Sequence, residues 1–488
     1  MSIIGREEET QELTHFLSSN VPEFLALYGR RRVGKTFLIR HFFEKQKALF
    51  FNITGTKNGP LKEQISHFVK EIGKIFYNGA HLKSSKNWDS TFGLLTDAFN
   101  MVPKTKKIVL FFDEFPWLAT KNSRLLQTLE YYWNQHWSRD SRIKLIICGS
   151  SASWIVEKII NNKGGLYNRI TRHMYLEPFN LRNTKKFLNS LGIKLTHDQI
   201  LQLYMVIGGI PYYLSKVEKG LSAAQNIERL AFQRKSFLLE EFNNLFSALF
   251  DNAEVYIQII KLIGHHRYGI GQEDLLNQLE KKYQGKSGLK KLKDLQDTNF
   301  IIGFKSHFQK KKGIYYKLID EYTLFYLDWI EPITSTLYTK SLMKGYWEKI
   351  YKSPAWQSWS GYAFESVCYK HLPEISHALR MSPTSIPNTW RYIPKKKTKD
   401  QGAQIDLLFD REDDAITVCE IKYTTLPYVI DKQEAAQLNN KISIFRKKTQ
   451  TEKQIFLTII SANGLKKNIY SEEMVDGLVT LSDLFEKI

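Results

Sequence analysis

The chain has 488 residues, of which 43% are hydrophobic and 25% are charged, proportions that exclude a disordered or fibrous protein. This length allows roughly three domains of about 150 residues, whose cores need neither a disulfide nor a metal for stability. Lysine and arginine number 70 against 50 aspartate and glutamate residues, a net charge of +20. This excess favours a polyanionic partner, nucleic acid before an anionic membrane surface, although a generally basic proteome would also explain it.

Targeting and redox signals are absent from the sequence. The three cysteines lie far apart without metal-binding spacing, which fits a reducing cytoplasm. The N-terminus lacks the apolar run of a signal peptide, and no stretch approaches the ~20 apolar residues of a membrane span. We therefore expect a cytoplasmic protein with no membrane segment.

Hydrophobic periodicity divides the chain into five predicted parts within an α/β fold class. Apolar runs at 24–28, 48–53, 108–112 and 144–148 alternate with helical patterns, as in a parallel sheet. The predicted parts are a core with a parallel sheet at 1–180, a helical lid at 181–252, a module of short helices and a hairpin at 253–319, a helical connector at 320–354 and an α/β domain at 355–488.

A phosphate-binding loop is predicted after the first strand, where Gly-x-x-x-x-Gly-Lys-Thr precedes a helical pattern. The loop consists of Gly29, Arg30, Arg31, Arg32, Val33, Gly34, Lys35 and Thr36. Its backbone N–H groups and the start of the helix would bind phosphate oxygens. We expect Lys35 to reach the β- and γ-phosphates of ATP and the Thr36 hydroxyl to ligate Mg²⁺. The three arginines would face nucleotide, nucleic acid or solvent, and the sequence does not choose among these.

Two further strands end in residues suited to ATP hydrolysis. The strand at 108–112 is followed by Asp113, which would hold Mg²⁺, and Glu114, which would act as general base toward water. Either acid alone would also suit the N-cap of a helix. The strand at 144–148 leads to Ser150, whose hydroxyl would bond the γ-phosphate or the attacking water, or would cap a turn.

These motifs together resemble the archaeal-type ATPases, which are related to AAA proteins, signal-transduction ATPases with numerous domains and the Orc/Cdc6 initiators. The resemblance rests on Ile4-Gly5-Arg6-Glu7, the phosphate loop, Phe112-Asp113-Glu114 and Gly149-Ser150-Ser151. It implies that Gly5 and Arg6 lie against the adenine of a bound nucleotide.

The same resemblance extends to two later segments. In the segment 167–179 it implies that Arg169 senses the γ-phosphate, with Arg172 a weaker candidate, and an ordinary surface arginine is the alternative. In Gly208-Gly209-Ile210-Pro211 it implies that Pro211 packs near the base, and a helix-breaking turn is the alternative.

Residues 253–317 form a basic segment, with 13 Lys and Arg against 6 Asp and Glu residues and a net charge of +7. Its helices, followed by strands near 300–302 and 315–318, resemble a winged helix, with the lysines Lys310–Lys312 between the strands. The predicted inward residues of the last helix are Leu289, Leu292 and Leu295, and the predicted outward residues are Lys290, Lys291 and Lys293. These lysines would bind DNA phosphates, or would form the solvated face of a structural module.

An acidic hairpin is predicted at 403–423, in which Asp406 lies across from Glu420 and Lys422 shares the face of Glu420. Two facing carboxylates can hold Mg²⁺ or Mn²⁺, and the lysine can orient water. A predicted helix supplies Glu365 as a further acid. A solvated cross-strand charge cluster would also explain the hairpin.

These residues resemble the PD-(D/E)xK, or restriction-endonuclease-like, superfamily, and the architecture resembles the domain of unknown function that commonly follows archaeal-type ATPases. The resemblance implies a helical acid at Glu365, metal ligands at Asp406 and Glu420 and a catalytic lysine at Lys422. Gln437 is a weaker candidate for substrate contact, and Lys395–Lys397 add nearby basic charge. The superfamily also contains inactive members.

The sequence therefore predicts an ATP- and Mg²⁺-dependent ATPase joined to a metal-dependent endonuclease domain that acts on nucleic acid, with DNA favoured. Family resemblance implies a role in prokaryotic defence or mobile-element biology. A second hypothesis is an ATP switch with an inactive nuclease-like domain that binds nucleic acid or a protein. A third is a signalling scaffold that forms a homo-oligomer on ATP binding.

Overall fold

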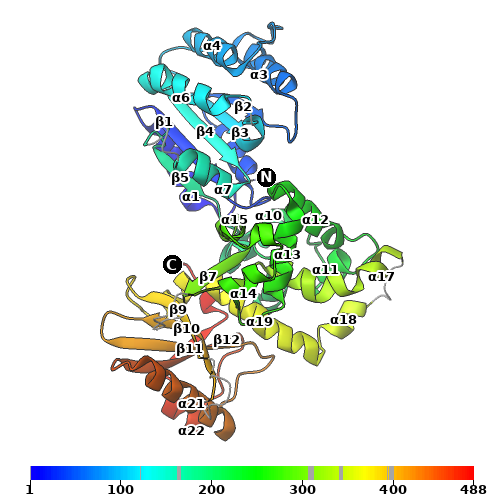
Figure 1. Ribbon diagram of the computed structural model, residues 1–488, viewed down its shortest axis with the longest axis vertical. Helices are drawn as coiled ribbons and strands as arrows, with labels where there is room; N and C mark the ends of the chain where they lie inside the picture. The colour runs from blue at the N-terminus through cyan, green and yellow to red at the C-terminus, as the bar shows by residue number, and fades with distance from the viewer. Residues whose placement is uncertain are drawn as a thin grey trace. The chain divides into compact units, whose positions relative to one another are not determined.

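The computed structural model describes residues 2–120, 122–161, 166, 168–305, 313–339, 345–392, 394 and 401–488. The chain forms two compact units, Met1–Pro178 and Phe179–Ile488 (Figure 1). Tyr167, Lys310–Lys312 and Lys395–Lys397 lie outside the described residues. Within the ranges just given, every helix is too short or too polar to cross a membrane.

The first unit is built on a parallel sheet with the strand order β2-β3-β4-β1-β5. The strands are β1 (Glu23–Tyr28), β2 (Leu49–Thr54), β3 (Ile108–Asp113), β4 (Ile143–Gly149) and β5 (Arg172–Tyr175). The four strands predicted from apolar runs are confirmed. Strand β5 was not predicted, because its sequence Arg-His-Met-Tyr buries only Met174 and lacks an apolar run.

Helices follow the strands of this sheet, as βαβ connectivity requires. They are α1 (Glu7–Ser18), α2 (Lys35–Phe43), α3 (Leu61–Phe76), α4 (Trp88–Ala98), α5 (Phe115–Leu118), α6 (Leu125–Gln135) and α7 (Ala152–Ile155). Strands β3 and β4 are buried along their whole length, because residues on both faces pack against other side chains. A buried cluster that includes Phe68, Phe92, Phe112 and Trp137 joins β3 to α3 and α4.

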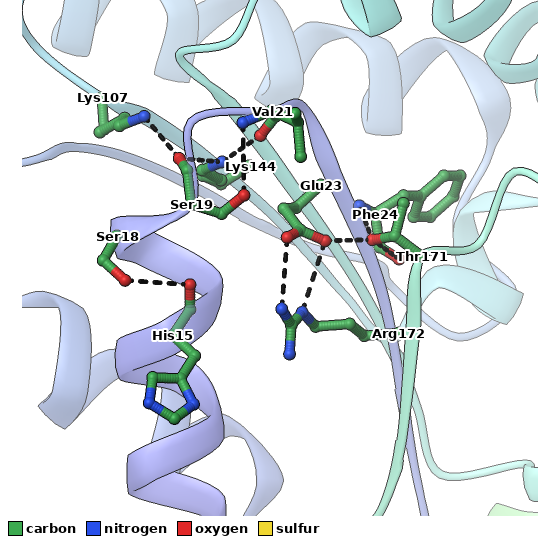
Figure 2. Close-up of polar contacts among 10 residues, drawn as sticks. All are labelled: His15, Ser18, Ser19, Val21, Glu23, Phe24, Lys107, Lys144, Thr171 and Arg172. Carbon is green, nitrogen blue, oxygen red and sulfur yellow. Dashed lines mark hydrogen bonds and ion pairs between the residues drawn. The ribbon is translucent and has the colours of Figure 1, made fainter.

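Two lysines fix the amino-terminal edge of the sheet (Figure 2). Lys144 at the start of β4 is fully buried, and its ammonium donates to the Ser19 carbonyl at 2.9 Å and to the Val21 carbonyl. Lys107 donates to the same Ser19 carbonyl at 2.6 Å. Burial lowers the pKa of Lys144 to about 8. The turn between α1 and β1 is therefore held by charge-assisted hydrogen bonds to its backbone.

The second unit begins with a group of helices: α8 (Leu181–Ser190), α9 (His197–Ile207), α10 (Pro211–Leu214), α11 (Ala223–Ala231) and α12 (Phe237–Leu249). Then come α13 (Ala253–Gly264), β6 (Ile270–Gly271), α14 (Gln272–Asn277), α15 (Lys286–Asp297), β7 (Ile301–Lys305) and β8 (Ile314–Leu318). Strands β6, β8 and β7 form a small antiparallel sheet in that order, close to the predicted strand positions.

Aromatic helical segments then lead to the last part of the chain. They are α16 (Glu321–Phe325), α17 (Thr334–Thr339) and α18 (Tyr346–Ile350), followed by the long α19 (Pro354–Lys370) and by α20 (Leu372–Ala378). Trp347, Trp356 and Trp359 are buried and pack against one another, which joins α18 to α19.

The C-terminal sheet has the order β13-β12-β11-β10-β9 and mixes strand directions. Its strands are β9 (Ile386–Tyr392), β10 (Ala403–Asp410), β11 (Ala415–Lys422), β12 (Gln454–Ser461) and β13 (Gly477–Thr480), with α21 (Lys432–Thr449) and α22 (Ile469–Met474) between them. Strands β10 and β11 form the predicted antiparallel hairpin, whereas β11 and β12 are parallel and α21 lies between them in sequence.

Buried polar contacts join the parts of the second unit that the sequence predicted as separate modules. Lys317 on β8 pairs with Glu365 on α19 at 2.5 Å, and Lys370 on α19 pairs with Glu321 on α16 at 2.6 Å. His371 accepts a hydrogen bond from the Leu181 backbone at 3.0 Å. Desolvated pairs such as these make independent motion of the modules costly, since breaking one leaves an uncompensated buried charge.

Candidate functional site

The sheet order of the first unit brings three strand ends together. Strand β4 lies between β1 and β3, and all three run in the same direction. The phosphate loop after β1, Ser150 after β4 and the acids Asp113 and Glu114 at the end of β3 therefore share the carboxyl edge of the sheet. Ligands of open parallel sheets bind at this edge.

The phosphate loop depends on glycine at both ends. Gly29 has φ +145°, and a Cβ there would lie 2.4 Å from the Leu176 carbonyl oxygen. Gly34 has φ +95°, in the left-handed region that glycine tolerates. The buried Lys35 ammonium donates to the carbonyls of Gly29 at 2.8 Å and Arg30 at 2.9 Å, and burial lowers its pKa. The lysine ammonium is thus held by carbonyls of the same loop whose backbone N–H groups would bind the phosphate oxygens of a nucleotide.

The predicted Mg²⁺ ligands are in direct contact. The Thr36 hydroxyl donates to Oδ2 of Asp113 at 2.8 Å, while Oδ1 of Asp113 accepts the Glu114 backbone N–H at 3.0 Å. Asp113 itself is 3% exposed. A hydroxyl and a carboxylate oxygen are hard ligands of the kind that Mg²⁺ prefers, so this pair fits the ion chemically.

Glu114 is fixed by Ser150. Its Oε2 accepts the Ser150 hydroxyl at 2.9 Å and the Ser150 backbone N–H at 3.2 Å. Its backbone has φ +44°, an uncommon left-handed conformation for a non-glycine residue. Burial, reinforced by Asp113, raises the pKa of Glu114, while Lys35 and Ser150 act in the opposite direction. A carboxylate held in this way has the position and the raised basicity expected of a general base.

The arginines of the phosphate loop are not equivalent. Arg30 is buried, at 1% exposure, whereas Arg31 and Arg32 are partly buried. The burial of Arg30 excludes the alternative that this side chain faces solvent. Arg32 adopts φ +72°, so the loop carries backbone strain next to the phosphate site.

Arg6 binds the protein's own backbone beneath this loop. Its guanidinium donates to the carbonyls of Val33 at 3.2 Å and Glu177 at 2.6 Å, and it pairs with Glu9 at 2.9 Å. Gly5 before it has φ +63°. These contacts give Arg6 a structural role in shaping the loop, and the contact of Gly5 and Arg6 with adenine stays a prediction.

Arg172 and Arg169 lie away from the phosphate loop. Arg172 pairs with Glu23 at 3.4 Å at the amino-terminal edge of the sheet, opposite the edge that carries the loop (Figure 2). Thr171 donates its backbone N–H to the Phe24 carbonyl at the same edge, and the exposed Arg169 precedes it. The weaker assignment of Arg172 to the γ-phosphate is therefore wrong, and Arg169 is not brought to the nucleotide site of its own chain.

The Gly-Gly-x-Pro segment has a local explanation in the second unit. Gly208 has φ +61° with Glu321 against it, and a Cβ on Gly209 would overlap the Phe179 carbonyl oxygen at 1.7 Å. Pro211 occupies the first turn of α10, where proline is tolerated. These contacts account for the segment as a helix-breaking turn, and the contact of Pro211 with a base stays a prediction.

A second set of predicted residues converges in the second unit. One pocket of about 480 Å³ is lined by Tyr268, Glu365, Gly402, Ala403, Gln404, Asp406, Glu420, Ile421, Lys422, Gln437, Asn440 and Lys441. We call it the acid pocket. It contains all five C-terminal residues that sequence reasoning selected, namely Glu365, Asp406, Glu420, Lys422 and Gln437.

The hairpin register explains how the two strand acids meet. Leu407 and Cys419 are directly paired across β10 and β11, and they are the immediate neighbours of Asp406 and Glu420. Side chains alternate along a strand, so both acids point to the face opposite Leu407 and Cys419 and line the same pocket.

Lysines surround these acids more closely than the sequence predicted. Lys422 contacts Glu420 at 3.2 Å, as expected, but it also contacts Glu434 at 2.9 Å. Lys441 pairs with the other oxygen of Glu420 at 2.5 Å. Two lysines, Lys422 and Lys441, therefore offset the charge of Glu420.

Two lysines that pair with these acids, Lys441 and Lys317, were not predicted, for different reasons. Glu434, Gln437 and Lys441 lie three and four residues apart on α21, so helical spacing from Gln437 could have identified Lys441. Lys317, which pairs with Glu365, comes from β8, and nothing in local sequence links it to a helix 48 residues later.

Asp406 is an acid of this pocket with a raised pKa. Burial, together with Glu365 and Glu420, raises the pKa of Asp406 to about 7, against the effect of Lys441 and Lys317. Gln404 donates to its Oδ1 at 3.3 Å. Three acids that share a low-dielectric pocket repel one another, and a cation among them relieves that repulsion.

The acid pocket fits a divalent ion through two carboxylates rather than three. Asp406 and Glu420 offer hard oxygen ligands. Among the described residues, however, no group of three or more His, Cys, Asp and Glu side chains is arranged to hold a metal ion. Glu365 is not a third ligand, because its carboxylate forms an ion pair with Lys317.

The basic helix α15 differs from its predicted pattern. Leu292 and Leu295 are fully buried, but Leu289 is 40% exposed, so its predicted inward position is wrong. Lys291 lies over the ring of Tyr256 at 4.3 Å and is partly buried, which corrects its outward assignment. Lys290 and Lys293 are exposed, as expected.

Comparison with known proteins assigns the two ends of the chain. Residues 3–217 match the family described as an ATPase domain predominantly from Archaea, and residues 326–438 match archaeal and bacterial proteins of unknown function. An uncharacterized protein of Methanocaldococcus jannaschii, MJECL04, is 27% identical over 87% of this chain and 88% of its own. The uncharacterized ATP-binding protein MJ1659 of the same organism is 22% identical over 54% of this chain and 83% of its own.

Two solved structures are similar over part of the chain. The Walker-type ATPase PABY2304 of Pyrococcus abyssi has a TM-score of 0.45 and 19% identity, over 67% of this chain and 96% of its own. The ORC2 protein of Aeropyrum pernix, solved as ADPNP-ADP complexes, has a TM-score of 0.44 and 13% identity, over 69% of this chain and 94% of its own. On the family match, the chain carries an archaeal-type P-loop ATPase domain, with the parallel sheet typical of that class.

Proposed function

We propose that the archaeal-type ATPase domain of this chain binds and hydrolyses ATP with Mg²⁺. The observation that carries the proposal is the continuous set of contacts Thr36–Asp113–Glu114–Ser150 beside the phosphate loop. These contacts bring a hydroxyl, two carboxylates and a second hydroxyl together at one edge of the sheet.

Each residue would have a separate task during hydrolysis. Lys35 would exchange its two carbonyl partners for phosphate oxygens, while the backbone N–H groups of the loop bind the phosphates. Mg²⁺ held at Thr36 and Asp113 would neutralise phosphate charge. Water attacks the γ-phosphorus and passes its proton to Glu114, while the bond from that phosphorus to the β–γ bridging oxygen breaks.

ATP binding and turnover by Lys35→Ala test this proposal. We expect loss of nucleotide binding, because the replaced ammonium would contact the β- and γ-phosphates. Lys45→Ala, an exposed lysine of the same unit, is the control and should match wild type. Unchanged hydrolysis by Lys35→Ala would overturn the assignment.

We propose further that the acid pocket hydrolyses a phosphodiester of nucleic acid, with DNA as the favoured substrate. The net charge of +20 supports a polyanionic substrate. The proposal is supported by the convergence of Glu365, Asp406, Glu420 and Lys422 in one pocket. Asp406 and Glu420 would hold Mg²⁺ or Mn²⁺, and Lys422 would orient the attacking water.

The test is cleavage of plasmid and oligonucleotides by the full chain with Mg²⁺ or Mn²⁺, with and without ATP. Glu420→Gln should abolish cleavage, and Asp410→Asn, an acid on the same hairpin outside the pocket, should not. Equal cleavage by wild type and Glu420→Gln would assign the activity elsewhere.

A second function is favoured by the lysine partners of the acids. Because Glu420 pairs with Lys441 and Glu365 pairs with Lys317, an inactive pocket that only binds nucleic acid in response to ATP is the alternative. Binding without cleavage under every metal and ATP condition would select it.

The segment 253–319, with its three helices and antiparallel strands, would act as a winged helix toward DNA through Lys290 and Lys293 on α15. Reversal of both charges should lower DNA affinity for all sequences and reduce the salt dependence of binding, since fewer counterions are released. Arg169, at the far edge of its own sheet, would reach a γ-phosphate only in a second copy of the chain.

A further inference from the structure

Tyr268 is an aromatic side chain at the mouth of the acid pocket, and it comes from the segment between α13 and β6 rather than from the C-terminal sheet. Its side chain is 57% exposed. The turn that presents it is closed by a hydrogen bond from the Gly269 N–H to the His266 carbonyl at 2.8 Å. Gly269 has φ +85°, so the turn depends on glycine.

Arg391 on β9 supports the tyrosine. Its guanidinium lies 5.4 Å from the centre of the Tyr268 ring and donates to the Tyr268 carbonyl at 3.5 Å. The ring is therefore anchored both through its own backbone and through a cation–π contact. An exposed ring that is fixed in this way offers a platform on which a planar ligand can stack.

The pocket lining also carries amide groups. Gln437 and Asn440 are exposed on α21, one turn apart, and both line the pocket together with Lys441. Amides present donors and acceptors side by side, the pattern that matches the edge of a nucleobase. The acids Asp406 and Glu420 lie in the same pocket, whose volume of about 480 Å³ is in the range of small-ligand sites.

We infer that the acid pocket takes an unpaired nucleotide, whose base stacks on Tyr268 and presents its edge to Gln437 and Asn440. The inference rests on the proposed phosphodiesterase function and names its substrate class, single-stranded or locally unpaired nucleic acid. A base within a duplex is covered on both faces by its neighbours, so it cannot stack on a side chain unless it leaves the helix. Stacking on an aromatic ring is tolerant of sequence, since every base has a π-face.

The experiment measures binding by the full chain without divalent metal, in EDTA, so that cleavage cannot contribute. Fluorescent single-stranded DNA, single-stranded RNA and duplex DNA of equal length are compared by anisotropy. We expect a single strand of one or both kinds to bind more tightly than duplex. Tyr268→Ala should weaken that binding by roughly 5- to 150-fold, the range that base stacking on an aromatic ring spans. Tyr268→Phe and Tyr268→Trp should bind like wild type, because they keep a stacking ring.

Tyr338→Ala is the matched control, since Tyr338 is a 44% exposed tyrosine of the same unit outside the pocket. It should bind like wild type. Equal affinity of Tyr268→Ala and wild type for single strands, or no preference for single strand over duplex, would overturn the inference. Binding that depends on Tyr268 in a protein that cleaves nothing with any metal would reject the phosphodiesterase and keep the subsite. Cleavage that is indifferent to Tyr268→Ala would do the reverse.

Discussion

The nucleotide site and the acid pocket both place acids on strands or directly after them, but they stabilise those acids differently. In the first unit, Asp113 and Glu114 receive hydrogen bonds from neutral donors, the hydroxyls of Thr36 and Ser150. In the second unit, Glu420 pairs with two lysines. Neutral donors leave the negative charge in place for Mg²⁺, whereas lysines already cancel it.

This difference has a consequence for metal binding. A divalent ion at the nucleotide site only has to replace a hydroxyl contact between residues that are themselves its ligands. A divalent ion in the acid pocket has to displace an ammonium group from Glu420. We therefore regard the nucleotide site as preorganised and the acid pocket as blocked by lysine until substrate or metal rearranges it.

The largest expected effect is the loss of ATP hydrolysis in Glu114→Gln. The amide cannot accept a proton from water, whereas Asp113 and Thr36 are untouched, so ATP should bind while hydrolysis falls by roughly 10²- to 10⁴-fold. Steady-state hydrolysis and equilibrium ATP binding are measured together. If the variant hydrolyses ATP at the wild-type rate, the base lies elsewhere in the chain.

Ser150→Ala should have a smaller effect with a characteristic pH signature. Its hydroxyl donates to Glu114 and favours the charged form, so its loss should raise the pKa of Glu114 further above the usual range. A general base is inactive when it is protonated. With a raised pKa, Glu114 becomes protonated at a higher pH as the solution is acidified, so the acid limb of the rate–pH profile should move to higher pH. We expect a decrease of roughly 10- to 150-fold near neutral pH, because a hydrogen bond to a charged group contributes about 1.5–3 kcal/mol. Ser151→Ala is the control, and the same acid limb in both variants would remove Ser150 from this role.

Asp406→Asn should change stability rather than ATP turnover. Because the folded protein raises the pKa of Asp406 to about 7, its protonated form stabilises the fold at low pH and this stabilisation is lost as pH rises toward 7. Asparagine cannot ionise, so the variant should unfold at a higher temperature than wild type at pH 8, with little difference near pH 4. Asp410→Asn, which removes an ion pair with Lys453 at 2.7 Å, should instead lose stability at pH 8. A pH-independent difference for Asp406→Asn would contradict the raised pKa of Asp406.

The sequence was informative wherever local order determines geometry. The phosphate loop, the strand ending at Asp113 and the hairpin that carries Asp406 and Glu420 each follow from short-range patterns, and the structure contains all three. Helical spacing wrongly predicted that Leu289 is buried. The buried face of α15 is set by Leu292 and Leu295 and by the side chains that pack against them.

Long-range pairing was beyond sequence reasoning. Lys317 is buried against Glu365 through a contact between β8 and α19, and no periodicity within either element encodes it. The same holds for Arg172, whose partner Glu23 lies 149 residues earlier on a neighbouring strand. Strand order decides such contacts, and it emerges only from the packed sheet.

Titration of Mn²⁺ into nucleotide-free Lys441→Met by calorimetry tests the central comparison most directly. If Lys441 occupies the place of a metal at Glu420, its removal should tighten Mn²⁺ binding by at least about tenfold, because one nearby positive charge no longer opposes the ion. Lys447→Met, an exposed lysine of the same helix, should match wild type. Equal Mn²⁺ affinity in wild type, Lys441→Met and Lys447→Met would show that lysine does not block the acid pocket.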